Sequence, residues 1–213
     1  TDGNILGYDA NGDPEAIATG SAGEVLTSGG AGVASAMAAA ADGGWVFVEN
    51  IEASASSTIL CVDQNIVAGY DYLVVWEDLL STTGDADLIM KFGTGATPTI
   101  LSSGYEGQTL RALSTTVTGK GAESSQVDII IAGGGAAGAA EKRYGSAVIY
   151  NPAAAEATAF RHECFYSTTN GSPSLLIGGG WQTGTAAITA IRFHPNASTI
   201  ATGSFTTYRR KRT

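Results

Sequence analysis

The chain has 213 residues, of which 44% are hydrophobic and 15% are charged, a composition typical of a globular protein and not of a disordered one. No apolar run approaches the roughly 20 residues of a membrane-spanning helix, so we expect no membrane partner. The formal net charge is −9, and no Lys or Arg precedes Lys91. This distribution disfavours binding of nucleic acid by the first half of the chain.

Residues 1–42 are rich in Gly, Ala, Ser and Thr and contain few large apolar side chains. Such a segment buries too little apolar surface to offset the entropy of ordering, so it must order against something else. We therefore predict an extended, Gly/Ala-rich docking segment. Its residues 33–41 favour either a short helix or a linker. The candidate docking anchors are its few large apolar residues: Ile5, Leu6, Tyr8, Val25 and Leu26.

From Trp45 onward the sequence consists of short runs rich in β-branched and aromatic residues, separated by clusters of Gly, Asn, Asp and Ser. The predicted strands are 45–51, 57–62, 70–80, 87–92, 99–101, 108–118, 125–132, 145–150, 158–167, 174–181, 187–193 and 203–209. Because no helical pattern intervenes, these runs predict one all-β domain over residues 43–213, an antiparallel β-sandwich.

The two cysteines, Cys61 and Cys164, lie in predicted strands about a hundred residues apart. They can pair only if the fold brings them together. The N-terminus lacks the basic region and apolar core of a signal peptide, so we expect a reducing compartment. Two buried free thiols are therefore expected.

Several motifs occur in a recognisable order along the chain. They are Trp45-Val46-Phe47-Val48, Ala53 to Thr58, Tyr70 to Val74, Tyr150-Asn151-Pro152, a Gly178-Gly179-Gly180-Trp181 turn, Ala190 to Phe193, and Ala201 to Phe205 with Tyr208. Separately, Gly20 to Ser28, followed by Gly29 to Gly32, is similar to a Gly-rich collar found ahead of fibre domains. Together these motifs resemble a module of fibre and appendage proteins in the virions of tailed bacteriophages.

The resemblance implies a jelly-roll-like sandwich, often trimeric, that is attached to the particle by its N-terminal segment. On this basis we expect a virion structural protein, a fibre, spike or decoration subunit, assembled in the host cytoplasm. Its partners would be two further copies and other virion proteins of the capsid or tail. Neither a cofactor nor a chemical step is expected, so the protein would not be an enzyme.

The alternative is a receptor- or carbohydrate-binding adhesin module of the phage, which would share this fold. Aromatic residues near predicted turns could then stack on the sugar rings of a host surface glycan. The candidate contacts are Tyr105 and Trp181, and Tyr166 has a similar setting.

Gly133 to Gly138 satisfies the G-x-G-x-x-G pattern of dinucleotide-binding sites and follows an apolar run. Residues 136–143 could begin a helix whose N-terminus holds a pyrophosphate. However, no further βαβ unit follows, and the next run ends in Asn151 and not in an acid. A loop between strands is therefore favoured.

Two other groups of residues contain side chains that could bind a metal ion. Asp9 to Pro14 offers closely spaced oxygen atoms for calcium, but Gly12 does not stand where an EF-hand loop has its glycine, so an Asn-Gly turn is favoured. In a strand, His162 and Cys164 would share one face and Glu163 would take the other. With His194 and Cys61 they lack the short paired spacing of structural zinc sites.

The chain ends in a basic tetrad, Arg209 to Arg212, which departs from the module that it resembles. The tetrad could contact phosphates or an acidic neighbour. A solvated tail or a salt-bridge partner between subunits is favoured, so binding of nucleic acid is not expected.

Overall fold

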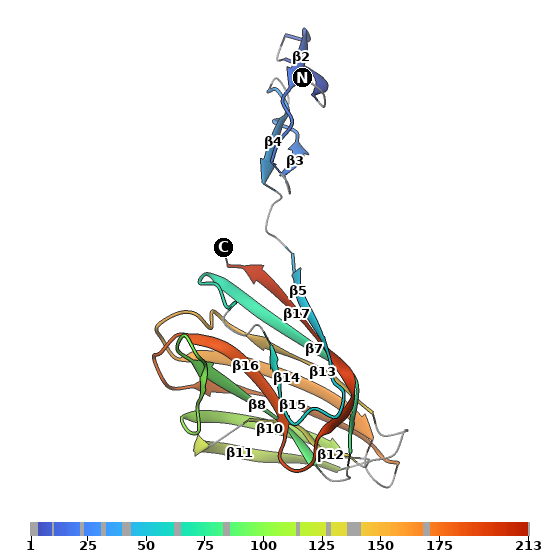
Figure 1. The fold of residues 1–213 in the computed structure, drawn as a ribbon, viewed down its shortest axis with the longest axis vertical. Coiled ribbons are helices and arrows are strands. Elements are labelled where there is room, and N and C mark those ends of the chain that lie inside the picture. Colours follow the sequence, from blue (N-terminus) through green and yellow to red (C-terminus); the bar gives the residue numbers. More distant parts are fainter. Residues whose placement is uncertain are drawn as a thin grey trace. The chain divides into compact units, whose positions relative to one another are not determined.

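The computed structural model describes residues 4–9, 11–21, 24–30, 33–39, 44–61, 65–82, 86–113, 116–126, 129–135, 142–167 and 171–212. The chain divides into two compact units, residues 1–43 and 44–213. All described regular elements are β-strands, which confirms the predicted all-β class (Figure 1).

The first unit is built from two β-hairpins. Strand β1 (Ile5–Tyr8) pairs with β2 (Pro14–Ile17), and β3 (Glu24–Thr27) pairs with β4 (Ala36–Ala39). The first hairpin turns at the expected Asn-Gly position: Gly12 has a φ of 85°, and the Asp9 carboxylate accepts hydrogen bonds from the backbone of Asn11 and Asp13. The segment is thus hairpin-paired where we predicted a simply extended chain, and residues 36–39 form a strand in place of a helix or linker.

The second unit is a β-sandwich of two antiparallel sheets. The wide sheet has eight strands in the order β11-β10-β15-β14-β13-β7-β17-β5. Their bounds are Thr116–Gln126, Tyr105–Leu113, Pro173–Gln182, Thr158–Ser167, Arg143–Ile149, Tyr70–Ser81, Ile200–Lys211 and Val46–Glu52. The narrow sheet has the order β12-β8-β16-β6, with β9 paired to β8. Their bounds are Ile129–Gly135, Ala86–Thr94, Ile188–Pro195, Ile59–Cys61 and Thr99–Ile100.

Aromatic side chains join the two sheets. The Phe193 ring of β16 lies 4.9 Å from Phe205 and 5.8 Å from Trp76, both in the wide sheet. Phe92 of β8 lies 6.0 Å from both Tyr105 and Phe160 of the wide sheet. These six aromatic side chains are almost fully buried, so they form the centre of the core.

Three predictions about the strands and turns were wrong. Residues 125–132 do not form one strand, because 125–126 end β11 in the wide sheet and 129–132 begin β12 in the narrow sheet. Residues 108–118 do not form one strand: β10 ends at Leu113 and β11 begins at Thr116, and the two strands pair as a hairpin. Residues 178–181 do not form a turn. They lie inside β15, paired with β10 on one side and β14 on the other.

The glycines of β15 allow its two neighbours to approach closely. A Cβ atom at Gly178 would lie 2.5 Å from the His162 Nε2 atom and 2.7 Å from the Gln108 carbonyl oxygen. At Gly180 it would overlap the carbonyl oxygen of Glu106. The run therefore serves close packing within a sheet, one of the uses of glycine in strands.

We predict that Gly180→Ala lowers the free energy of unfolding by about 1–3 kcal/mol, because β10 must shift to admit the methyl group. Gly119→Ala in β11 is the matched control, since a Cβ atom there meets nothing within 4 Å. Urea denaturation followed by circular dichroism measures both. Equal stability of the two variants would contradict the packing role of the glycine run.

Candidate functional site

Burial alternates along β14, so this strand shows which face of the wide sheet is buried and which is exposed. Phe160, His162 and Cys164 are buried, whereas Arg161 and Glu163, which alternate with them, are exposed. The prediction that His162 and Cys164 share one face, with Glu163 on the other, is thus confirmed. The outer face of the sheet, which carries Arg161 and Glu163, is the only face of β14 open to a ligand or partner.

Besides Trp181 at the end of β15, six large apolar side chains project from the outer face of β11, β10, β15, β14 and β13, and we call these six the apolar patch. Each is between 40% and 64% exposed. The members are Leu110, Val117, Tyr144, Phe165, Leu175 and Ile177. A solvated face of an antiparallel sheet normally carries polar residues at such positions, so the patch is the most distinctive surface feature of the sandwich.

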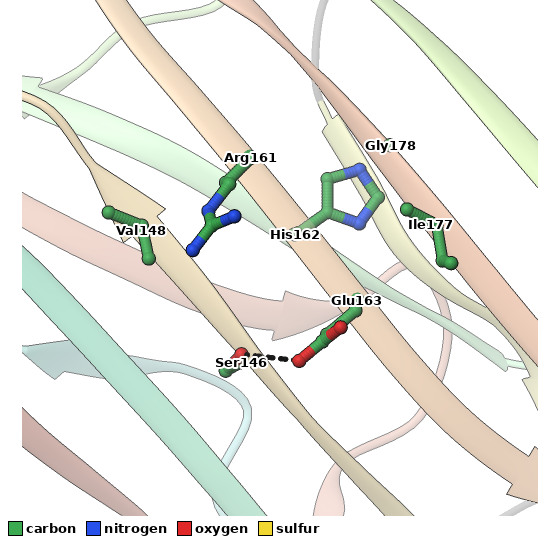
Figure 2. A pocket seen from close by; sticks show the side chains of 7 residues that line it. All are labelled: Ser146, Val148, Arg161, His162, Glu163, Ile177 and Gly178. Carbon is green, nitrogen blue, oxygen red and sulfur yellow. Dashed lines mark hydrogen bonds between the residues drawn. The ribbon is translucent and has the colours of Figure 1, made fainter.

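A shallow hollow of about 120 Å³ borders the patch between β13, β14 and β15. Ser146, Arg161, Glu163 and Ile177 contribute to its lining. Figure 2 shows Ser146 and Glu163 meeting across adjacent strands, with 3.4 Å between the hydroxyl oxygen and the carboxylate. The hollow thus offers one guanidinium, one carboxylate and an apolar wall to a small ligand.

Trp181 lies on the same outer face, at the end of β15. Its side chain is 51% exposed, and its Nε1 atom donates a hydrogen bond of 2.8 Å to the Glu106 carboxylate. Glu106 is its registered neighbour on β10. The hydrogen bond holds the indole in place while its ring stays open, which is the arrangement that stacking on a sugar requires.

Tyr105 was predicted as a second glycan contact, and this prediction was wrong. Its side chain is 1% exposed, and its hydroxyl group accepts a hydrogen bond from the backbone N–H of Phe92, across the sandwich. Tyr166 is equally buried. Both rings are core residues because they lie on the inner face of the wide sheet.

The predicted docking anchors lie in the hairpins of the first unit. Ile5, Leu6 and Tyr8 of β1 are 41%, 68% and 62% exposed, and Val25 and Leu26 of β3 are both 47% exposed. Their exposure leaves them available to a partner, and docking itself stays a prediction.

The two thiols and the buried imidazole of His162 are uncharged at neutral pH. Cys61 and Cys164 are free and buried, as expected. Burial raises the pKa of the Cys164 thiol to about 12 and also raises the pKa of Cys61. Burial lowers the pKa of His162 to about 4. At neutral pH all three groups are uncharged, so neither thiol is a ready nucleophile.

The remaining sequence motifs form no site among the described residues. Gly133, Gly134 and Gly135 end β12, whereas the rest of the G-x-G-x-x-G pattern lies outside the described residues. Arg143, at the end of the stretch that could have begun a helix, is the first residue of a strand. The part of the chain that the structure describes holds no cluster of three His, Cys, Asp or Glu side chains that could bind a metal.

The basic tetrad is part of the fold, which corrects the prediction of a solvated tail. Arg209, Arg210 and Lys211 belong to β17. Arg210 and Arg212 both approach the Asp71 carboxylate of β7, with N–O distances of 3.1 and 3.7 Å. The Arg210 guanidinium also lies 4.9 Å from the centre of the Trp45 ring. The acidic neighbour of the tetrad is therefore within the same chain.

Comparisons with protein-family models, curated proteins and solved structures found no match. In the described ranges, no helix is long and apolar enough to cross a membrane.

We predict that Asp71→Asn lowers the free energy of unfolding by about 1–2 kcal/mol, because it removes the charge that faces Arg210 and Arg212. Asp71 is 7% exposed and also accepts a hydrogen bond from the backbone of Asn151. Asp78→Asn is the control, since its ion pair with Lys142 is largely exposed and contributes little. Thermal unfolding compares the two, and an equal shift in Tm would refute a stabilising role for the contacts of Asp71 with Arg210 and Arg212.

Proposed function

We propose that this chain is a structural protein of a tailed-bacteriophage virion, a fibre, spike or decoration subunit that assembles as a homotrimer. The observation that carries the proposal is the apolar patch. The sandwich already has a complete aromatic core, so six further exposed apolar side chains on one face indicate an assembling surface. The order of the phage-like motifs along the chain supplies the virion context.

The two units suit separate tasks in this role. The core residues all come from positions 53–205, so the sandwich unit has a core of its own. The first unit has no buried residue among those described, and most of its large apolar side chains are exposed. In our proposal the first unit docks on other virion proteins of the head or tail through Ile5, Leu6, Tyr8, Val25 and Leu26, and the sandwich is displayed.

The mass of the full-length chain in solution tests the assembly. We predict three times the chain mass by light scattering, at micromolar concentrations. A chain beginning at Gly44 should keep the trimeric mass, because the patch lies wholly within the sandwich unit. A monomer for both chains would refute the homotrimer and favour a decoration subunit held by the lattice of the particle.

A second candidate function is binding of a host surface glycan, and the fixed, open indole of Trp181 favours it. We predict that Trp181→Ala abolishes retention of the protein on host surface polysaccharide. Phe47→Ala is the matched control, because Phe47 is 59% exposed on another strand of the same sheet. Isothermal titration with the purified polysaccharide gives the affinities, and unchanged binding by Trp181→Ala would exclude this indole as the contact.

A further inference from the structure

We propose that the apolar patch is the surface through which copies of this chain associate with one another. This inference deepens the proposed homotrimer, on which it rests, by assigning the contact to one face and one set of strands. It commits to a second copy of the chain as the occupant.

The patch is continuous across the sheet. Leu110 of β10 is the registered partner of Ile177 of β15, and Leu175 is the partner of Phe165. Phe165 is also paired with Tyr144 of β13. Ala112 links Leu175 to Val117 of β11. Registered partners on one face have Cβ atoms about 5 Å apart, so these side chains form a single apolar surface.

One row of registered residues shows where the patch ends. The row runs from Leu110 and Ile177 to Glu163 and then Ser146. It continues through Val75 to Thr206 and Asn50, which are joined by a hydrogen bond of 2.8 Å. Along this row the outer face is therefore polar at β17 and β5, but apolar at β10 and β15. Elsewhere on β5 and β17, Phe47 is 59% exposed and packs on Tyr208, which makes a separate aromatic contact. The contrast within one row shows that the apolar character is local and begins beyond Glu163.

The patch supplies the apolar centre of an interface but not its whole area. Six side chains that are each about half exposed present roughly 500 Å² of apolar surface, if a large apolar side chain measures about 150–200 Å². In a trimer each copy contacts both others, so three such surfaces around a three-fold axis bury roughly 1,500 Å² in total, or about 500 Å² at each pairwise contact. Specific interfaces begin at about 1,000 Å², so the margin of the face, with Arg161 and Glu163, must be buried as well. Adjacent copies meet through two different parts of the same face, because the contacts in a three-fold ring are heterologous.

The charges at the margin suit a second copy better than a highly charged partner. Arg161 and Glu163 lie two positions apart on β14 and project from the same face. A rotated second copy can therefore place Glu163 of one chain against Arg161 of the other. Lys142 at the β13 end is already paired with Asp78. Among the described side chains at this margin, Arg161 is the one cation without an ion pair, which offers little to a polyanion such as nucleic acid.

Cysteine labelling of the full-length chain tests the contact directly. Cys61 and Cys164 are buried and free, so an introduced surface cysteine is the only ready target for a maleimide. Leu110→Cys samples the patch, and Val67→Cys is the control, with 48% and 42% exposure in the isolated chain. In the assembled protein we expect labelling of Leu110→Cys to be at least tenfold slower. Dilution to monomers should remove the difference.

A paired substitution gives the second measurement. Leu110→Glu with Ile177→Lys replaces two registered partners by an ion pair, so the isolated sheet keeps a favourable cross-strand contact. We expect the mass to fall to that of a monomer while circular dichroism is unchanged. Val33→Glu with Val67→Lys is the control for charge, since both valines are exposed outside the patch. This control should remain assembled.

The outcomes separate this inference from the proposal beneath it. If the unmodified chain is monomeric at every concentration, both the homotrimer and the patch contact fail. If it is trimeric but Leu110→Cys labels as fast as Val67→Cys, the patch contact alone fails, whether or not the paired variant folds. Protection of Leu110→Cys in a monomer would assign the patch to another part of the same chain and would also overturn the inference.

Discussion

The structure depends on the contact between the two sheets at Phe193, which lies against Trp76 and Phe205. This contact decides which face of β7 and β17 is inside. Hydrogen bonding fixes the register between neighbouring strands. The assignment of inner and outer residues in β7 therefore also fixes which residues face inward in β13, β14, β15 and β10. Burial of Cys164 and Leu176 then forces Phe165 and Leu175 outward, so the apolar patch follows from the position of the core.

The division of the sequence into β-type runs was enough to predict much of the fold. The bounds predicted for residues 158–167 are those of β14, because this run contains three aromatic residues and is followed by Asn170-Gly171. Prediction from residue type failed where a residue typical of turns lies in a strand, and where a turn lacks typical turn residues. The resemblance gave Gly178 to Gly180 as a turn, although the predicted strand 174–181 already contained them. They lie in β15, whose neighbours leave no room for side chains. The break between β10 and β11 was missed because Leu113 and Thr116 enclose no Gly, Pro or Asn.

The surface site was harder to predict than the fold. Leu175, Leu176 and Ile177 follow one another in the sequence, so composition alone cannot tell which of them faces outward. The role of Tyr105 was also hidden, since its partner is the backbone of Phe92 on the opposite sheet. The position of Arg210 depends on Asp71, 139 residues earlier in the chain. Each of these positions is set by a long-range pairing that a local pattern does not carry.

Strands at the two sides of the wide sheet have different structural roles. At one side Arg210 joins Asp71 of β7 to Trp45, the residue that follows the boundary between the two units by one position. At the other side β10, β11, β13, β14 and β15 carry the apolar patch. Charge and cation–π contacts secure the strands next to the unit boundary, whereas apolar surface occupies the strands remote from it in the sheet order. Anchoring of the first sandwich residues and association through the patch therefore use different side chains and different forces, so each can vary without loss of the other.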